Sequence, residues 1–530
     1  MQSLDILIKN GLVIDGCGNP WFHADVGIEG KKITRLGNLM NAKSERTIDA
    51  KDMIVAPGFV DIHNHSDVPI LVSGRAESMV HQGVTTMLTC NCGGSPFPLY
   101  GEALEHAKIE YKKQYNLKVD WSTVGEYEEK LRGQGISINV GLQIGHGTLR
   151  GAVIGYENKA PASSEMKEMK QLIADHMKAG CFGMSTGLGY PPGMFAETSE
   201  VIELCKTVAK YGGIYTTHAR PGYTFPQNLE EALEIGEKAG LPVEMAHIGS
   251  TTGQKHNWGR ARAVTLNMID AARARGVDFT ADIYPYTVSG GGLSMYIPQW
   301  AHEGGSSKML DRLVDPNIRK KIKEDDEVKK LLLSRGWDQV LLHHLSEKNK
   351  IYNGKTLQQV AEIKKADPFD VACDLLIEEN GHASFFGLFG LEEDIKTLMK
   401  HEAVMIGSDG SALQPTGVLG KGIAHPRNYG TFARIIETYV GGGVLSLPEA
   451  VHKMTGMPAW RLRLSDRGLI KPGAFADVTI FNPFLVKENY TLTAPPTFPE
   501  GIPYVIVNGS VTIDNGKHTG AMAGEIIHRP

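Results

Sequence analysis

The chain has 530 residues, of which 42% are hydrophobic and 22% are charged, and its formal net charge is -5. This composition is ordinary for a globular protein, and the length leaves room for one large domain with a smaller satellite. The slightly acidic balance gives no sign of the high basic charge that nucleic-acid-binding proteins usually carry, so we expect no nucleic-acid partner.

The beginning of the chain predicts neither a signal peptide nor a membrane anchor. Asp5 and Lys9 interrupt its apolar stretch, and no apolar run elsewhere is long enough to cross a bilayer. The six cysteines are few and scattered, which indicates a reducing compartment in which a special cysteine would be a metal ligand or a nucleophile. We therefore expect a cytoplasmic protein without a membrane partner.

Short apolar runs separated by turns occupy both ends of the chain. We expect strands at residues 4–8, 12–14, 26–28 and 33–36, and again at 477–481, 503–509 and 511–513. Because chain ends often lie close together, the two β-rich ends predict one small β domain formed by residues 1–56 and 467–530.

The middle of the chain, residues 57–466, alternates short apolar runs with longer amphipathic segments. This alternation is typical of an α/β fold with a parallel sheet, and eight such units would close a (β/α)₈ barrel. The expected strands are 59–63, 85–89, 138–144, 181–185, 214–218, 243–247, 279–284 and 404–408. Helices are expected at 163–179, 199–211, 229–239 and 262–274.

The alternation breaks after the seventh expected strand. Residues from about 289 to 367 begin with a Gly-rich stretch and continue into a run of charges at 319–330. We interpret this segment as an insertion that forms a lid, and the charge run as a solvated helix face.

Polar residues follow several of the expected strands, where a barrel places its active site. His63 and His65 follow the first strand, and residues two apart on a strand point to the same face. Two imidazoles on one face suit a divalent metal, although such a pair can also be a satisfied core pair.

A cysteine follows the second strand. Cys92 enters a Gly-rich loop where a thiolate would be exposed to a metal, whereas a buried cysteine is more often a small hydrophobe. Cys90 lies two residues earlier on the same face, so the pattern leaves both as candidate ligands.

One histidine follows each of the fifth and sixth strands, and an aspartate follows the eighth. These residues are His218, His247 and Asp409. Asp409 could also cap a helix, since Ser-Asp-Gly is a capping sequence. The complete set at strand ends favours a metal centre.

These residues and the motifs around them resemble the D-aminoacylase (N-acyl-D-amino-acid deacylase) family of the amidohydrolase superfamily. The likeness runs essentially from end to end of the chain. The matching motifs lie at 91–95, 185–193, 257–260, 282–287, 408–410, 425–432, 468–477 and 507–509.

The resemblance implies a (β/α)₈ barrel with a small β-sandwich and a set of metal ligands. A tightly held zinc would be bound by Cys92, His218 and His247. A second, weaker position would be formed by His63, His65 and Asp409. Cys92 takes the place of the lysine carbamate or glutamate that bridges two metals in many relatives.

The resemblance also implies hydrolysis of an amide C–N bond, with an N-acyl-D-amino acid as the small-molecule substrate. Asp409 would take a proton from a zinc-bound water and pass it to the leaving amine. His63 or Tyr190 could assist as the oxyanion forms. Arg427 would bind the substrate α-carboxylate together with Tyr190 and Ser289.

One position departs from the family pattern. Relatives commonly carry a lysine two residues after the histidine of the sixth strand, whereas this chain has Gly249. Lys255, further along the same loop, could compensate. A cyclic-amide hydrolase of the hydantoinase or dihydroorotase type, or an amidase for carboxylate-poor substrates, stays open as an alternative, as does a scaffold that has lost its metal. The sequence does not indicate an oligomeric state.

Overall fold

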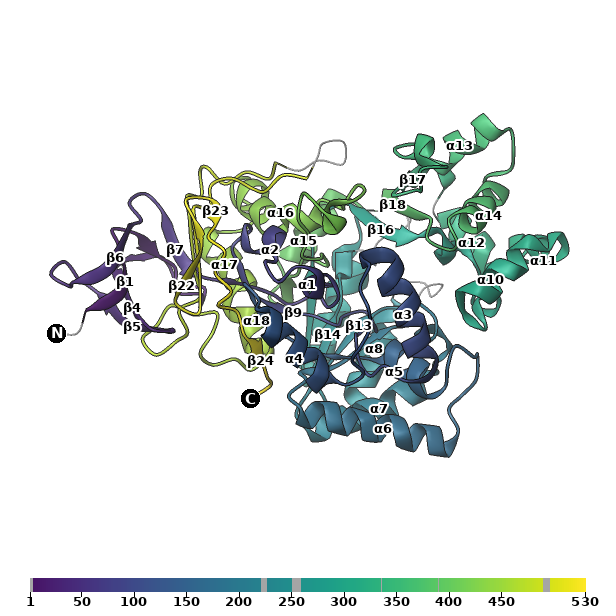
Figure 1. Cartoon of the computed structure of the whole chain (residues 1–530), viewed down its shortest axis with the longest axis horizontal. Coiled ribbons are helices and arrows are strands. Elements are labelled where there is room, and N and C mark those ends of the chain that lie inside the picture. Colours follow the sequence, from purple (N-terminus) through teal and green to yellow (C-terminus); the bar gives the residue numbers. More distant parts are fainter. Residues whose placement is uncertain (1–2, 221–225, 250–258, 335, 389, 490–495) are drawn as a thin grey trace.

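The structure is a computed structural model that describes residues 3–220, 226–249, 259–334, 336–388, 390–489 and 496–530 (Figure 1). Eight parallel barrel strands follow one another around a closed ring, with the third strand divided into β10 and β11. They are β8 (Phe59–Asp61), β9 (Val84–Leu88), β10 (Asn139–Gly141), β11 (Ile144–Gly145), β12 (Gly183–Gly187), β13 (Ile214–His218), β14 (Val243–Met245), β15 (Phe279–Ile283) and β19 (Val404–Ile406).

The ring closes where the first and eighth strands meet. Asn64 and Gly410 form a parallel bridge just beyond β8 and β19. Two backbone hydrogen bonds reinforce it, from His65 N to Gly410 O at 2.7 Å and from Asp409 N to His63 O at 2.8 Å. Closure therefore places the segments that follow the first and eighth strands side by side.

Helices cover the outside of the ring, as expected for a (β/α)₈ barrel. They are α1 (Pro69–Val72), α2 (Glu77–Val80), α3 (Gly101–Tyr115), α4 (Val124–Gln134), α5 (His146–Val153), α6 (Ser163–Lys178), α7 (Thr198–Lys210), α8 (Gln227–Ala239), α9 (Asn267–Ala274), α15 (Glu392–Met399), α16 (Arg427–Arg434) and α17 (Leu447–Met454). The predicted helices at 163–179, 199–211 and 229–239 are present. The one predicted at 262–274 begins as a π-helix, Arg262–Leu266, before continuing as α9.

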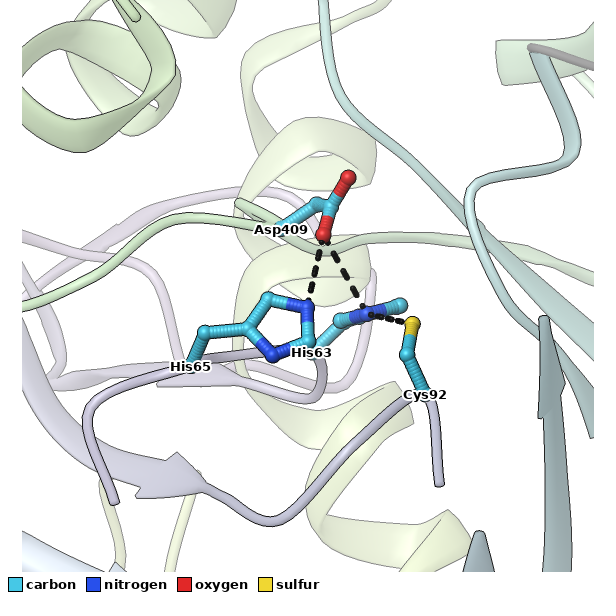
Figure 2. Close-up of side chains that lie close together, drawn as sticks. All are labelled: His63, His65, Cys92 and Asp409. Carbon is cyan, nitrogen blue, oxygen red and sulfur yellow. Dashed lines mark hydrogen bonds and ion pairs between the residues drawn. The ribbon is translucent and has the colours of Figure 1, made fainter. Parts of the chain in front are cut away.

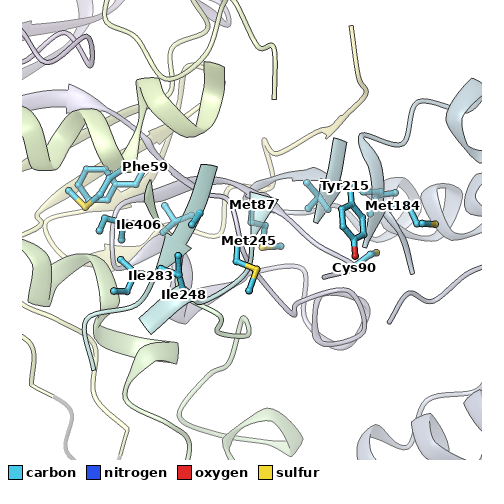
Figure 3. Packing of buried hydrophobic residues seen from close by; sticks show 14 of the residues in the cluster. Phe59, Met87, Cys90, Met184, Tyr215, Met245, Ile248, Ile283 and Ile406 are labelled. Atoms are coloured by element: carbon cyan, nitrogen blue, oxygen red, sulfur yellow. The ribbon is translucent and has the colours of Figure 1, made fainter. Parts of the chain in front are cut away.

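Side chains on the first, second and eighth barrel strands alternate between two apolar clusters. Phe59, Met87 and Ile406 belong to the large cluster that also holds the helix side chains (Figure 3). Their sequence neighbours Val60, Leu88 and Met405 belong to a smaller cluster that includes side chains in and just after α18 (Gly456–Arg461). The first cluster packs the helices on the barrel, and the second joins the strands to the α18 region.

Strands from both ends of the chain form two further sheets with one shared core. The first sheet has the order β5-β4-β1-β6 and the second has the order β23-β22-β21-β20-β7-β2-β3. Their bounds are β1 (Leu4–Lys9), β2 (Leu12–Val13), β3 (Phe22–His23), β4 (Asp25–Glu29), β5 (Lys32–Gly37), β6 (Ser44–Asp49), β7 (Ile54–Pro57), β20 (Val478–Phe481), β21 (Tyr504–Val507), β22 (Ser510–Asp514) and β23 (Lys517–His518). Ile6, Val26, Val55, Val478 and Ile506 share the core that joins the two sheets.

The terminal segment differs from the predicted division at 467–530 in one respect. Strand β24 (Ile526–Ile527) pairs in parallel with barrel strand β10. Arg529 N also donates to Gly180 O, just before β12. The chain therefore returns from the β-sandwich to the barrel after β23.

The insertion lies between β15 and β19 and projects from the barrel as a separate lobe (Figure 1). It contains β16 (Val288–Gly292), α10 (Gly305–Val314), α11 (Pro316–Lys323), α12 (Asp326–Ser334), β17 (Val340–His343), α13 (Leu357–Lys364), α14 (Pro368–Glu378) and β18 (Ser384–Leu388). The segment continues past the predicted end at residue 367, because β18 pairs with both β16 and β17.

The lobe has an apolar core of its own, to which Leu293, Leu313, Phe369 and Leu376 contribute. The charged run at 319–330 covers parts of α11 and α12, with its lysines mostly exposed and the intervening Ile322 and Val328 buried. Among the described residues, no helix combines the length and apolar content that crossing a bilayer requires.

Candidate metal centre

The five predicted ligands and Asp409 meet at the carboxyl ends of the barrel strands. They form two overlapping groups, in each of which the potential ligand atoms lie within 4.8 Å of one another. One group contains His63, His65, Cys92 and Asp409 (Figure 2), and the other contains Cys92, His218 and His247. Cys92 belongs to both groups, whereas Cys90 belongs to neither and is buried in the apolar core.

The second group has the donor set and spacing of a zinc site. Cys92 Sγ lies 3.9 Å from His218 Nδ1 and 3.7 Å from His247 Nε2, and the two nitrogens are 2.8 Å apart. Tetrahedral zinc with ordinary Zn–N and Zn–S bond lengths separates its ligand atoms by roughly 3.3–3.6 Å. The two distances to sulfur are close to this range, and a modest separation of the two rings would admit the ion.

The first group provides a second position on the other side of the Cys92 sulfur. Sγ lies 3.4 Å from His63 Nε2, which is in turn 3.4 Å from Asp409 Oδ1. His65 Nε2 lies 3.0 Å from the same carboxylate oxygen (Figure 2). One sulfur, two imidazoles and one carboxylate are ligands suited to zinc, so this group also fits the metal, and Cys92 would be a ligand common to both positions.

Three of these residues have a left-handed backbone. The φ angles are 51° for Cys92, 35° for His247 and 50° for Asp409. This conformation costs a residue other than glycine about 1–3 kcal/mol and persists where the surroundings enforce it, commonly at functional sites. At each position the turn lies just beyond a barrel strand, at the mouth where the donor atoms meet.

Two buried aspartates that the sequence motifs did not assign hold this arrangement. Asp282, on β15, accepts hydrogen bonds from His63 Nδ1 and from His247 N, both at 2.9 Å. Asp61, at the end of β8, accepts from Ser408 N and from Asn64 Nδ2, both at 2.8 Å. Asp282 lies within a motif that carried the family resemblance. Its contacts are with residues that follow other strands, so the spacing within the motif could not reveal them.

Burial favours the neutral form of the histidines, of the Cys92 thiol and of Asp282. It lowers the pKa of His63 to about 4 and that of His247 to about 3, so both rings are neutral at pH 7 and have a lone pair for a metal. Burial also raises the pKa of the Cys92 thiol and of Asp282 well above their usual values. A bound divalent cation opposes that effect and favours the thiolate and the carboxylate.

Asp409 stays ionised despite its burial. Burial alone would raise its pKa, but the charge of Arg427, followed by the histidines of the site, holds it well below its usual value. Burial likewise acts against the protonation of His65, yet its hydrogen bond to Asp409 and the charge of that carboxylate raise its pKa overall. The carboxylate is therefore available to accept a proton near neutral pH.

The residues predicted to bind substrate lie around the same mouth. Arg427, the first residue of α16, forms an ion pair with Asp409, and its guanidinium lies 5.2 Å from the centre of the Tyr284 ring. Tyr190 Oη lies 3.4 Å from His218 Nδ1. Ser289 is half-buried on β16, opposite Gly387 of β18, and a Cβ added at the next residue, Gly290, would lie 4.0 Å from Arg427 NH2.

Gly249 has little space for a longer side chain in its present backbone position. A Cβ there would lie 3.2 Å from two atoms of Ile283. Lys255, the residue predicted to compensate, lies outside the described residues. With glycine at position 249, the side chain that brings a positive charge to Asp409 among the described residues of the mouth is Arg427.

We expect the metal-free protein to lose thermal stability as the pH falls from 7 to 4. The pKa of His63 is about 4 in the folded protein and near 6.5 in an unfolded chain, so the unfolded chain binds the proton more readily in this window. The loss is on the order of 3 kcal/mol for His63 alone. Asp409, whose pKa is also lowered, acts in the same direction, whereas the raised pKa values of His65 and Asp282 oppose part of the loss.

Thermal unfolding of chelator-treated protein at a series of pH values measures this effect. A His63→Asn variant should show a shallower decrease of the melting temperature, because it lacks one of the depressed pKa values. A wild-type melting temperature that stays constant or rises on acidification would contradict the expectation.

Comparisons of the sequence with protein families and with individual proteins agree on one family. The model of the amidohydrolase family matches residues 46–296 and 337–513. A D-aminoacylase from Alcaligenes xylosoxydans xylosoxydans is 32% identical over 530 residues, which cover 100% of this chain and 98% of that protein.

Two solved structures have a TM-score of 0.80, and in each case the alignment covers 99% of this chain and 100% of the other. One is a D-aminoacylase with a binuclear metal centre, 30% identical. The other is an N-acyl-D-glutamate deacylase from Bordetella bronchiseptica, 28% identical, in complex with zinc and a phosphonate inhibitor that mimics the tetrahedral intermediate. Together with the geometry of the mouth, these similarities make the chain a metal-dependent amidohydrolase that acts on C–N bonds and a member of the D-aminoacylase (N-acyl-D-amino-acid deacylase) family.

Proposed function

We propose that the protein hydrolyses N-acyl-D-amino acids to a carboxylate and a free D-amino acid. The observation that carries this proposal is the position of Asp409, whose carboxylate contacts His63 and His65 on one oxygen and Arg427 on the other. A proton acceptor thus lies between a metal position and a cation that can bind an anionic substrate. The D-aminoacylase and D-glutamate deacylase relatives support the choice of substrate class.

The ligand set supports zinc as the metal. Cys92, His218 and His247 would hold the tightly bound ion, and His63, His65 and Asp409 would hold a weaker one with Cys92 as the bridge. Zinc bound at this mouth would supply a Lewis acid and a water molecule of lowered pKa. The zinc in the Bordetella bronchiseptica relative supports this assignment.

Asp409 would act first as a base and then as an acid. Its lowered pKa keeps it ionised at neutral pH, which allows it to accept a proton from the attacking water. An amine leaves an amide readily only after protonation, and Asp409 is placed to return the proton to the nitrogen. Tyr190 Oη, near His218, is a candidate to donate to the developing oxyanion.

Arg427 would bind the substrate α-carboxylate. A guanidinium can form two parallel hydrogen bonds with a carboxylate, and this one is kept in place by the Tyr284 ring and by its position at the start of α16. Ser289 on neighbouring β16 would add a hydroxyl group. A glycine at position 249 leaves Arg427 to carry more of this interaction than in relatives with a lysine there.

The fourth barrel strand does not favour the cyclic-amide alternative. That reading expects a bridging lysine on the fourth barrel strand, and β12 has the sequence Gly-Met-Ser-Thr-Gly. Cys92, from the loop after β9, lies between the two donor groups instead.

The proposal is tested by measuring amine release from paired N-acetyl-D- and N-acetyl-L-amino acids, with apolar and acidic side chains, by the zinc-loaded protein. We expect hydrolysis of the D-series alone. Replacing the α-carboxylate of the best substrate by a carboxamide should lower kcat/KM roughly 10- to 100-fold, because Arg427 then loses a charged partner. If the zinc-loaded protein hydrolyses none of the N-acyl amino acids, the proposed function is wrong.

A further inference from the structure

Asp282 contacts one member of each donor group. It is on β15, its side chain is 1% exposed, and the His63 side chain is equally buried. Its two oxygens have different partners: Oδ2 accepts from His63 Nδ1 and Oδ1 accepts from His247 N. His63 belongs to the first donor group and His247 to the second, so one carboxylate contacts a member of each.

The contact with His63 determines which ring nitrogen faces the metal position. When Nδ1 carries the proton and donates it to Asp282, Nε2 has the free lone pair. That Nε2 atom lies 3.4 Å from both Cys92 Sγ and Asp409 Oδ1. The carboxylate therefore selects the tautomer that can bind a metal at this position.

The contact with His247 acts on the backbone. His247 follows β14 in the left-handed conformation, with φ of 35°, and its N–H is not part of the pairing between β14 and β15. Asp282 Oδ1 satisfies this buried donor and holds the turn that directs the His247 ring toward Cys92 and His218.

The close packing of neighbouring atoms confines the carboxylate. A Cβ added at Gly407, just after β19, would lie 2.9 Å from His63 Cβ and 3.1 Å from both Asp282 Cβ and Asp282 Oδ1. The backbone of the eighth strand thus packs directly on the His63–Asp282 pair. The pair has little freedom to rotate into another hydrogen-bonding arrangement.

From these contacts we propose that Asp282 is a positioning residue that couples the two metal positions, fixing the tautomer of His63 and the backbone turn of His247 with one carboxylate. The proposal rests on the metal centre of the proposed function and not on the choice of substrate. It assigns to Asp282 no contact with the substrate or with the reacting atoms.

An Asp282→Asn variant separates the two roles. The amide oxygen can still accept from His247 N, and this interaction orients the side chain because the reverse orientation would place two donors against each other. The NH₂ group then occupies the place of Oδ2 and donates to His63 Nδ1, so the ring must carry its proton on Nε2. The position formed with Cys92, His65 and Asp409 loses a ligand, while the position formed by Cys92, His218 and His247 is preserved.

The experiment is a titration of metal-free protein with Zn²⁺, followed by calorimetry and by the zinc content after dialysis. Wild-type protein should bind two ions with different affinities. In Asp282→Asn we expect the tighter site to keep its affinity and the weaker site to lose about 10- to 100-fold, the usual effect of removing the hydrogen-bond partner of a metal-binding histidine. The variant should resemble His65→Ala, which removes a ligand of the weaker position directly.

Asp394→Asn is the matched control. Asp394 is a buried aspartate on α15 that, like Asp282, accepts a hydrogen bond from a backbone N–H, with Gly259 N and Ala261 N as its partners. Both sites should be unchanged in this variant. If Asp282→Asn does not fold, Asp282→Ser, which removes the charge and retains an acceptor oxygen, should give the same loss.

The proposal is overturned if Asp282→Asn binds two zinc ions with wild-type affinities, if its tighter site is the one lost, or if the wild-type protein has no second site. These results do not depend on substrate. If the proposed function is wrong, the wild-type protein will bind two zinc ions normally but show no deacylase activity. If the proposal for Asp282 is wrong, the wild-type protein will be active and Asp282→Asn will bind zinc as the wild type does.

Discussion

An Asp409→Asn variant is expected to lose about 10²- to 10⁴-fold in kcat on the best N-acyl-D-amino acid, the range usual for removal of a general acid–base group. The amide cannot accept the proton of the attacking water or return one to the leaving amine. The shape of the side chain is preserved, and its oxygen can still accept a hydrogen bond from His65 or Arg427, so the effect should fall on kcat more than on KM.

The measurement combines steady-state kinetics with zinc content, because Asp409 also belongs to the weaker donor group. We expect the tighter zinc to be retained. Asp374→Asn is a control of the same chemical type on the insertion, where Asp374 pairs with Arg319, and it should leave kcat unchanged. A variant with one zinc bound and kcat within tenfold of wild type would remove Asp409 from the proton transfer.

Replacing Cys92 by alanine is expected to abolish the binding of both metal ions, and the activity with it. Cys92 is the one residue shared by the two donor groups, so its removal leaves each position one ligand short and removes the thiolate that compensates the charge of both ions. By contrast, loss of His65 should affect the weaker position alone.

Zinc content after dialysis and activity with added zinc measure the effect of Cys92→Ala. Cys90→Ala is the appropriate control, since Cys90 lies two residues away in the same left-handed conformation and is buried in the core. It should lower stability while retaining zinc. Wild-type zinc content in Cys92→Ala, or loss of zinc from Cys90→Ala, would contradict the assignment of the bridge.

The sequence predicted the barrel because short apolar runs alternate with longer amphipathic segments, a pattern typical of a parallel sheet covered by helices. Two of the predicted strands extend too far at their carboxyl ends, where a predicted site residue follows. The strand predicted at 243–247 ends at Met245, and the one predicted at 404–408 ends at Ile406. In both cases the backbone leaves the sheet to turn His247 or Asp409 toward the metal positions.

Features that depend on long-range pairing could not be predicted from local patterns. β16 reads as a Gly-rich loop and becomes a strand because it pairs with β18, almost a hundred residues later. β24 has two residues, too few to show a periodic pattern, and it is a strand because it pairs with β10. The function of Asp282 was missed for the same reason: His63 is its neighbour through the closed barrel and is 219 residues away in sequence.

The substrate-binding residues were predicted from family resemblance, which did not predict the contact between Arg427 and Asp409. The sequence suggested Arg427 as a carboxylate-binding group, and the structure pairs it with Asp409. Because the proposed proton acceptor and the proposed anion-binding group are in direct contact, we expect substrate binding and proton transfer to be electrostatically linked at this mouth.

The separate core of the insertion bears on how this enzyme could have diversified. Its first and last strands, β16 and β18, are paired antiparallel neighbours, so the lobe starts and finishes at adjacent points on the barrel. Joining such a unit to a scaffold costs little loop-closure entropy, and its own apolar cluster means that the barrel need not be repacked to receive it. Replacement or recombination of the lobe could therefore alter what reaches the mouth while the predicted metal ligands, all on the barrel, stay in place.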